Sequence, residues 1–314
     1  MGLSRNLLRS AGFDRRTILS FFKSVLNYPK VLLSKTRMAK DRVVSLSNMR
    51  VPGLIREISA DSLLFYYGNI HSQRGQDGIL AEIFRRLGIQ SGLFVEFGAW
   101  DGVYLSNSRW LFEKGWNGVF IEENSQRFDQ LNNIYGDSTI NIKSLVGAPS
   151  FGLIGEPLGK LLKSRGVDPV QVTFVSIDVD GPDLDIFEDM DFSPPVVLIE
   201  GGFNFVPTME TRQPPEIGWR FQQPLKVILD VASKRGYDAV CFCQDTYLVR
   251  KDLSSNFPKI DAHNLFRDAY FFMPDTFRKD ILKTRLDFRI VEAEQNVFGV
   301  NRPHAPINLP SHDK

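Results

Sequence analysis

Acidic side chains stand at the ends of two apolar runs in this sequence, where they could bind a cation or accept a proton. Asp178 and Asp180 end the stretch Val172–Gly181, and Glu200 ends a similar stretch farther along the chain. Hard cations such as Mg²⁺ take carboxylate oxygens as ligands, and a carboxylate can also remove the proton from a reacting hydroxyl without any metal. A structural alternative is that Asp180 or Asp183 caps the helix expected to follow. The sequence therefore predicts a metal site or a metal-free catalytic site, with helix capping as the third interpretation.

The same pattern occurs earlier, in the run Leu93–Gly102, where an apolar segment ends in two acidic residues and two glycines. Its apolar residues are typical of a buried strand of a parallel sheet, and its glycines are typical of a tight turn. Ligands of open α/β sheets bind beyond the carboxyl ends of the strands, so we expect a site there. Trp100 and Asp101 occupy positions where a dinucleotide fingerprint needs small residues, which argues against NAD. The acidic groups instead suit a cationic, hydroxyl-bearing ligand.

Two motifs together resemble those of class I S-adenosylmethionine-dependent methyltransferases, and most of all the FkbM-type family and its close relatives. They are Phe94–Gly102 and Ser176–Gly181, and the resemblance covers residues 57–275. It implies an α/β fold with a Rossmann-like sheet, mostly parallel with an antiparallel strand at its edge, and with helices on both faces. The FkbM-type pattern has Lys and Glu where this chain has Ser176 and Asp180, which indicates relatives with a Ser-Ile-Asp-x-Asp motif.

The resemblance implies that the first strand lies beside the fourth and the fourth beside the fifth, which brings the later carboxylates to one crevice. Because neighbouring strands are about 4.8 Å apart, Asp178 and Glu200 could share a ligand. Asp178, Asp180 and Glu200 would then be catalytic residues and, if a metal is used, the ligands of Mg²⁺. His263, which we expect in a loop, is a further candidate base, although a lone loop histidine is more often solvated.

The resemblance also implies that S-adenosylmethionine binds at the ends of the first strands. The turn after the first strand would position the methionine end, and Ser144–Gly147 would line the adenine pocket. An acidic residue about twenty positions beyond such a turn can accept hydrogen bonds from both ribose hydroxyls. Glu122 stands there with Glu123 as its rival, and the alternative is an exposed strand-end acid. The expected cofactor-binding residues are Gln73, Glu96, Gly98, Ala99, Asp101, Gly102, Glu122, Glu123, Leu145 and Asp178.

The segment Ser72–Gly78 resembles the one that precedes the first strand in this methyltransferase group. It leads into a predicted helix that ends at Gly88. Gln73 or Asp77 would take part in the cofactor site. The alternative is that Asp77 only caps its own helix.

These observations favour an S-adenosylmethionine-dependent O-methyltransferase that acts on a sugar hydroxyl of a polysaccharide, a glycolipid or a glycosylated natural product. Transfer to oxygen is implied by the resemblance. One alternative is an enzyme that uses a nucleotide-sugar, which would need Arg or Lys near the turns for the phosphates; Asp101, Glu122 and Asp178 argue against it. The other is a non-catalytic Rossmann-like scaffold of a membrane-associated glycan assembly.

The net charge of +1 is distributed unevenly along the chain. Residues 1–56 hold twelve basic and two acidic residues and form a predicted basic amphipathic arm, with a charge of +10 against −9 for the remainder. We expect an α/β domain at 57–275 and a partly disordered C-terminal extension at 276–314. The arm would bind its own domain, a second subunit in a homo-oligomer, a partner protein or an anionic membrane surface. Nucleic acid is not expected, because the arm lacks an aromatic stacking platform.

Cysteine usage and hydropathy favour a cytoplasmic protein. The basic arm also allows a peripheral position at the inner face of the membrane. The two cysteines, Cys241 and Cys243, are too close in a strand to pair with each other and too few for a structural zinc site. No run approaches the roughly 20 apolar residues of a membrane span, and no signal peptide is recognisable.

Overall fold

The structure is a computed structural model, and it describes residues 58, 61–203, 205, 207, 209–215 and 222–272. The predicted N-terminal arm at 1–56 and the C-terminal extension at 276–314 lie outside the described residues. What the sequence indicates about these two segments therefore stays a prediction.

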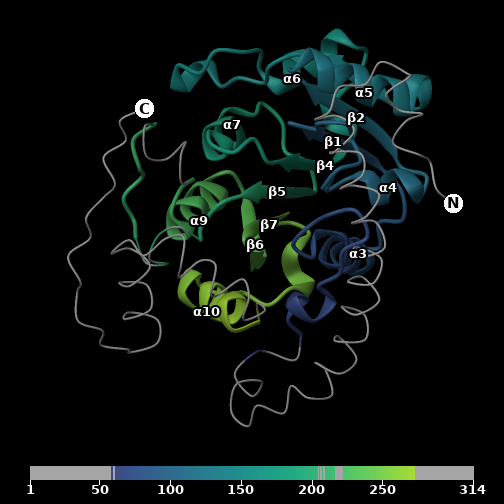
Figure 1. The fold of residues 1–314 in the computed structure, drawn as a ribbon. Coiled ribbons are helices and arrows are strands. Elements are labelled where there is room, and N and C mark those ends of the chain that lie inside the picture. The colour runs from purple at the N-terminus through teal and green to yellow at the C-terminus, as the bar shows by residue number, and fades with distance from the viewer. Residues whose placement is uncertain are drawn as a thin grey trace, which may run out of the picture. The chain divides into compact units, whose positions relative to one another are not determined.

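A seven-stranded sheet forms the centre of the fold, with the strand order β3-β2-β1-β4-β5-β7-β6 (Figure 1). β7 runs antiparallel to both of its neighbours, and the other pairs are parallel. The predicted Rossmann-like sheet is confirmed, including the first strand beside the fourth and the fourth beside the fifth; the antiparallel strand lies next to the edge strand. The strands are β1 Leu93–Phe97, β2 Asn117–Glu122, β3 Ile140–Lys143, β4 Val172–Ile177, β5 Val196–Glu200, β6 Tyr237–Cys243 and β7 Asp245–Arg250.

Helices cover both faces of this sheet, as predicted. Side chains of α3, α4, α5 and α10 join one core layer, and those of α6 and α7, with most of α9, join the other. The α-helices are α3 Gln76–Leu87, α4 Arg109–Glu113, α5 Ser125–Tyr135, α6 Leu158–Ser164, α7 Asp183–Asp189, α9 Leu225–Lys234 and α10 Ala262–Phe272. Short 3₁₀ helices are η1 Leu63–Tyr66, η2 Gly136–Ser138, η3 Pro149–Phe151, η4 Pro169–Gln171 and η5 Ser254–Asn256. None of the helices among the described residues has the length and apolarity that a membrane span requires.

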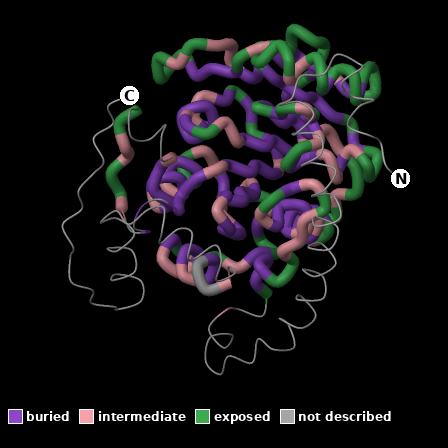
Figure 2. The backbone as a smooth tube through the Cα atoms, viewed as in Figure 1, coloured by how far each residue is buried: buried purple, intermediate pink, exposed green. Residues whose placement is uncertain are grey.

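Alternation along the strands decides which face of the sheet each acidic side chain joins. On β1, Phe94 packs in the core layer on the α3 face, whereas Val95 packs in the opposite layer. Residues two apart on a strand share a face, so Glu96 points to the α3 face as well. The same alternation brings Ser176 of β4 and Glu200 of β5 to that face. Figure 2 shows that the central strands are buried along most of their length.

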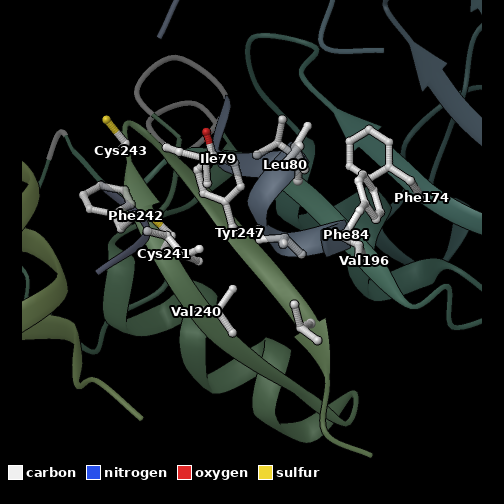
Figure 3. Close-up of a cluster of buried hydrophobic side chains, with 14 of the residues drawn as sticks. Ile79, Leu80, Phe84, Phe174, Val196, Val240, Cys241, Phe242, Cys243 and Tyr247 are labelled. Carbon is white, nitrogen blue, oxygen red and sulfur yellow. The ribbon is translucent and has the colours of Figure 1, made fainter. Parts of the chain in front are cut away.

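The core layer on the α3 face continues across β6 and β7 (Figure 3). Ile79, Leu80 and Phe84 of α3 pack there, and Cys241 and Cys243 lie in the same cluster. Both cysteines are buried free thiols, and burial raises their pKa well above the usual range. The thiols are therefore packing residues that stay protonated.

Candidate functional site

The turn after β1 is built on two glycines in the left-handed region. Gly98 has φ +67° and Gly102 has φ +71°. A Cβ on Gly98 would lie 2.7 Å from the backbone oxygen of Asp178, and a Cβ on Gly102 would lie 2.5 Å from the Tyr135 ring. Glycine is required at Gly98 because the loops that follow β1 and β4 approach each other there. The turn thus lies beside the carboxylates at the end of β4.

Between these glycines, Asp101 shapes the turn with its own side chain. Its Oδ1 accepts hydrogen bonds from the N–H groups of Val103 at 2.9 Å and Tyr104 at 2.7 Å. Ala99 is buried, and its N–H donates to the Ile121 oxygen at 3.2 Å. Asp101 is half-buried, and a carboxylate has acceptor positions beyond these two bonds.

Glu96 is buried directly below this turn. Its carboxylate accepts hydrogen bonds from the Ser106 hydroxyl at 2.7 Å and from the N–H groups of Asn107 at 2.9 Å and Ser108 at 3.2 Å. Burial raises the pKa of Glu96 to about 7 despite these donors. The side chain holds the 106–108 segment in place, so its predicted effect on the cofactor would be indirect.

The two acids predicted to compete for the ribose differ in exposure. Glu122 is buried and accepts the N–H of Trp100 at 2.8 Å on Oε2 and the N–H of Asn124 at 2.8 Å on Oε1. Glu123 is exposed to solvent. A carboxylate has about four lone-pair positions, so Glu122 keeps acceptor capacity in addition to these two bonds. Both residues lie where a ribose is expected, and Glu122 also fixes the turn.

Exposed apolar side chains border the same edge of the sheet. Trp100 is 40% exposed and Leu145, one of the predicted adenine-pocket residues, is 43% exposed. The Arg127 guanidinium lies 3.4 Å from the centroid of the Trp100 ring. A backbone hydrogen bond connects the segment that holds Leu145 to the end of β2, because the N–H of Ser144 donates to the Glu122 backbone oxygen at 3.2 Å. Flat apolar groups beside hydrogen-bonding acids are suited to a purine nucleoside.

The later carboxylates meet as predicted. One oxygen from each of Asp178, Asp180 and Glu200 lies within 4.8 Å of the other two. Arg74 Nη1 lies 3.4 Å from Glu200 Oε1, and Gln222 Nε2 donates to Glu200 Oε2 at 2.8 Å. Asp180 is exposed and has φ +57°, a conformation that Asp tolerates better than most residues. These three side chains have the spacing to share one cation.

Two further buried acids adjoin this cluster, and the sequence patterns did not single them out as site residues. Burial raises the pKa of Asp183 and of Asp245 to about 7 each, and nearby Asp178 raises both further. Burial, with Asp178 next, raises the pKa of Glu200 to about 10. Burial and the charge of Asp180 also raise the pKa of Asp178. The cluster therefore holds protons near neutral pH.

Asp183 has a structural task in this cluster. Its carboxylate accepts the N–H groups of Val179 and Gly181, each at 2.8 Å, and both donors precede α7. Asp183 thus shapes the loop that carries Asp178 and Asp180. The capping interpretation applies in this modified form to Asp183, whereas Asp180 is exposed at the cluster.

The segment before α3 contributes side chains to the cluster, although not the one predicted. Gln73 is exposed, whereas Arg74 contacts Glu200 and Gln76 Nε2 donates to Asp245 Oδ2 at 2.6 Å. Asp77 Oδ2 accepts three N–H groups of the preceding loop, those of residues 70, 71 and 72. Asp77 therefore stabilises the loop that presents Arg74. A lone basic residue in a segment otherwise rich in amides and glycines was the signal available for Arg74.

His263 lies in a helix and not in the expected loop. It belongs to the first turn of α10, whose apolar face is formed by Ala262, Leu265, Phe266 and Ala269. Within the described residues no hydrogen bond or ion pair joins its ring to the carboxylates of the cluster. Its catalytic role stays a prediction.

A separate cavity of about 520 Å³ lies where the C-terminal half of α3 faces η5. Among its lining residues are Tyr66, Glu82, Arg86 and Phe257. None of the predicted site residues borders it. This cavity is a second place at which a ligand could bind.

No protein-family model matches this sequence, and no curated protein matches it. The structure is similar to that of a methyltransferase from Geobacter sulfurreducens in complex with S-adenosyl-L-homocysteine. The two sequences are 13% identical, the match covers 79% of this chain and 89% of that chain, and the TM-score is 0.32. It is also similar to the structure of TrmK of M. capricolum with S-adenosyl-homocysteine. Here the identity is 8%, the match covers 68% of this chain and 91% of that chain, and the TM-score is 0.36. A methyltransferase from Aquifex aeolicus matches with 14% identity, coverage of 54% and 87%, and TM-score 0.29. At these scores the similarities alone assign no function, and the fold assignment rests on the strand order.

Proposed function

We propose that this chain binds S-adenosylmethionine at the carboxyl ends of β1, β2 and β3, beside the carboxylates that follow β4, and transfers its methyl group to a sugar hydroxyl. The observation that carries the proposal is the position of the glycine turn and the carboxylate cluster. They lie together where the strand order reverses, between β1 and β4, and Gly98 approaches Asp178 there. Ligands of open α/β sheets bind at this reversal.

The residues at this edge fit the parts of the cofactor. The turn at Gly98 leaves room for the methionine end, with Asp101 beside it as a partner for the ammonium group. Glu122 and Glu123 are the candidate acceptors for the ribose hydroxyls, and Leu145 borders the adenine. The acidic side chains are suited to a cationic, hydroxyl-bearing ligand, and the apolar side chains are suited to its base.

The bound cofactor would supply an activated methyl group, and the chain's own side chains would orient the acceptor and take its proton. Asp180 is the exposed member of the cluster and therefore the group best placed to contact an acceptor hydroxyl. Glu200, with a pKa raised to about 10, is protonated near neutral pH and can donate a hydrogen bond but cannot act as the base. With Asp180 in contact with the acceptor and Glu200 as a hydrogen-bond donor, the site suits an acceptor that reacts through a hydroxyl group. A polysaccharide, a glycolipid or a glycosylated natural product would each present such a group.

Calorimetric titration with S-adenosylhomocysteine tests the cofactor site. We expect one molecule to bind per chain, and we expect Asp101→Asn and Glu123→Gln each to weaken binding by about tenfold or more because a charged partner is lost. Asp101→Asn keeps an oxygen that can accept the bonds of the turn. Asp137→Asn, which removes an exposed acid that precedes β3 at the opposite edge, is the matched control and should leave binding unchanged. Absence of binding to the intact protein would contradict the proposal.

Methyl transfer is tested with labelled S-adenosylmethionine and a panel of sugar-containing acceptors, beside amine acceptors of similar size. We expect label on oxygen, and a kcat lowered at least about a hundredfold by Asp180→Asn, since general bases contribute this much. Label found only on nitrogen would contradict transfer to oxygen and leave the cofactor site in place.

One observation favours an enzyme that uses a nucleotide-sugar as second candidate. Arg127, which lies over Trp100 beside the glycine turn, is a cation of the kind that a diphosphate requires. The acids Asp101, Glu122 and Asp178 at the same edge oppose a phosphate. Titration with a nucleotide-sugar in parallel with S-adenosylhomocysteine separates the two candidates, because only one of the two compounds should bind.

The basic segment 1–56 fits a protein that works next to an anionic membrane surface or a partner protein. We propose a cytoplasmic protein with this arm as its docking element. A non-catalytic scaffold would use the same arm but would bind no cofactor.

A further inference from the structure

When its three carboxylates are ionised, the cluster carries more negative charge than Arg74 neutralises. Asp178, Asp180 and Glu200 meet within 4.8 Å, and Arg74 lies 3.4 Å from Glu200. A divalent ion together with Arg74 would balance the three carboxylates when all of them are ionised. Oxygen ligands drawn from two neighbouring strand ends are what Mg²⁺ and Mn²⁺ prefer.

Among the residues that the structure describes, two buried oxygens next to the cluster find no hydrogen-bond partner, and they are the independent indication of a missing ligand. Asp245 is 1% exposed and lies opposite Glu200 in the β5–β7 pairing, and its Oδ1 is unpartnered. Asn107 is 3% exposed, its side chain hydrogen-bonds to Asp178, and its Oδ1 is also unpartnered. A buried acceptor without a donor is unfavourable. Water bound to an ion in the cluster would supply donors to both oxygens.

We propose that Asp178, Asp180 and Glu200 bind one divalent cation, Mg²⁺ or Mn²⁺, whose waters donate to Asp245 and Asn107. Because Asp180 is exposed, the ion would keep exchangeable positions toward solvent. Neighbouring hydroxyls of a polyol are ligands that could occupy these positions. The cation site itself does not depend on methyl transfer, so its failure and the failure of the proposed function are separate results.

Titration of the full-length protein with MnCl₂ alone tests the site, with no cofactor or acceptor present. Calorimetry at pH 7.5 reports the number of ions bound per chain and their affinity. We expect one ion per chain. No Mn²⁺ binding would overturn the proposal.

The variant Asp180→Asn tests whether the ion binds at the carboxylate cluster. Asp180 is exposed, and Asn tolerates φ +57° as well as Asp does, so the variant should keep its fold, which circular dichroism checks. We expect it to bind Mn²⁺ at least about tenfold more weakly, because one charged ligand is lost. The matched control Asp137→Asn should bind as the unmodified protein does. Equal affinity in Asp180→Asn would locate the ion elsewhere and overturn the assignment.

Discussion

Glu96 shows how burial sets the behaviour of single residues in this site. Its carboxylate accepts three hydrogen bonds, yet burial raises its pKa from 4.5 to about 7. An acid with a higher pKa in the folded state binds its proton more tightly there than in the unfolded chain. Its contribution to stability is therefore complete at low pH and is lost as the pH rises from the unfolded value of 4.5 through about 7.

Glu96→Gln, which imitates the protonated acid, should remove this pH dependence. We expect the free energy of unfolding to fall between pH 5 and pH 8 by roughly 2 to 3 kcal/mol more in the unmodified protein than in the variant. Urea unfolding at both pH values measures the difference. Parallel losses in the two proteins would show that Glu96 is ionised in the fold at pH 5 already.

Gly98→Ala should destabilise the fold more than Gly88→Ala. Both glycines have a positive φ, +67° and +69°. A Cβ on Gly98 would meet the Asp178 oxygen at 2.7 Å, whereas one on Gly88 would meet none of the described atoms within 4 Å. The conformational strain alone costs about 1 kcal/mol, and we expect the contact to add about 1 to 3 kcal/mol for Gly98 only. Denaturant unfolding of both variants provides the comparison. Equal losses would mean that the two loops do not approach as described.

The residues of the site were predictable where they lie at the end of a strand. Asp178 and Glu200 end apolar runs, Glu96 lies one residue before the end of β1, and parallel strands bring such ends together. Arg74 and Asp245 were not predictable in this way, because their role depends on contacts across the fold. Arg74 is 126 residues away from Glu200 in sequence, and no local periodicity encodes that distance.

At the scale of elements, the loop before α3 connects the helix to the carboxylate cluster. Asp77 accepts the N–H groups of residues 70, 71 and 72, and the same segment presents Arg74 to Glu200 and Gln76 to Asp245. One buried carboxylate thus fixes the loop that places two polar side chains at the site.

Asp77→Ala should loosen this loop without unfolding the domain. We expect faster hydrogen–deuterium exchange at residues 69–75, because three backbone donors lose their acceptor, and unchanged exchange in α10. Asp77→Asn, which keeps one side-chain oxygen, should show a smaller effect. Unchanged exchange at 69–75 in the Ala variant would contradict the role given to Asp77.

Most elements follow from the sequence, but two positions differ from what local patterns suggest. The polar run Gln244-Asp245-Thr246 between two apolar runs favours a hairpin turn, yet Asp245 is the first residue of β7 and pairs with Glu200. Gln244, with φ +66°, makes the turn tight enough for this register, and alternation alone does not reveal that. His263 was expected in a loop, although Ala262, Leu265 and Ala269 recur at helical spacing and predict α10.

At the scale of the whole molecule, charge separates the basic segment 1–56 from the acidic remainder. The proposed cofactor site is built from residues 73–200, with the adjoining acid Asp245 on β7. Removal of residues 1–56 should therefore leave the affinity for S-adenosylhomocysteine unchanged within about twofold, since the side chains proposed to contact the cofactor all belong to residues 73–200. Calorimetry on the shortened chain measures this. A loss of binding would make the arm part of the site.

Hydrogen–deuterium exchange of the full-length protein, with and without S-adenosylhomocysteine, locates the bound cofactor. We expect slower exchange at residues 98–104, 122–125 and 144–147, which form the carboxyl edge of β1, β2 and β3. The region around the separate cavity, residues 61–66 and 254–258, should not change. Protection confined to that cavity, or no protection anywhere, would contradict the proposed cofactor site.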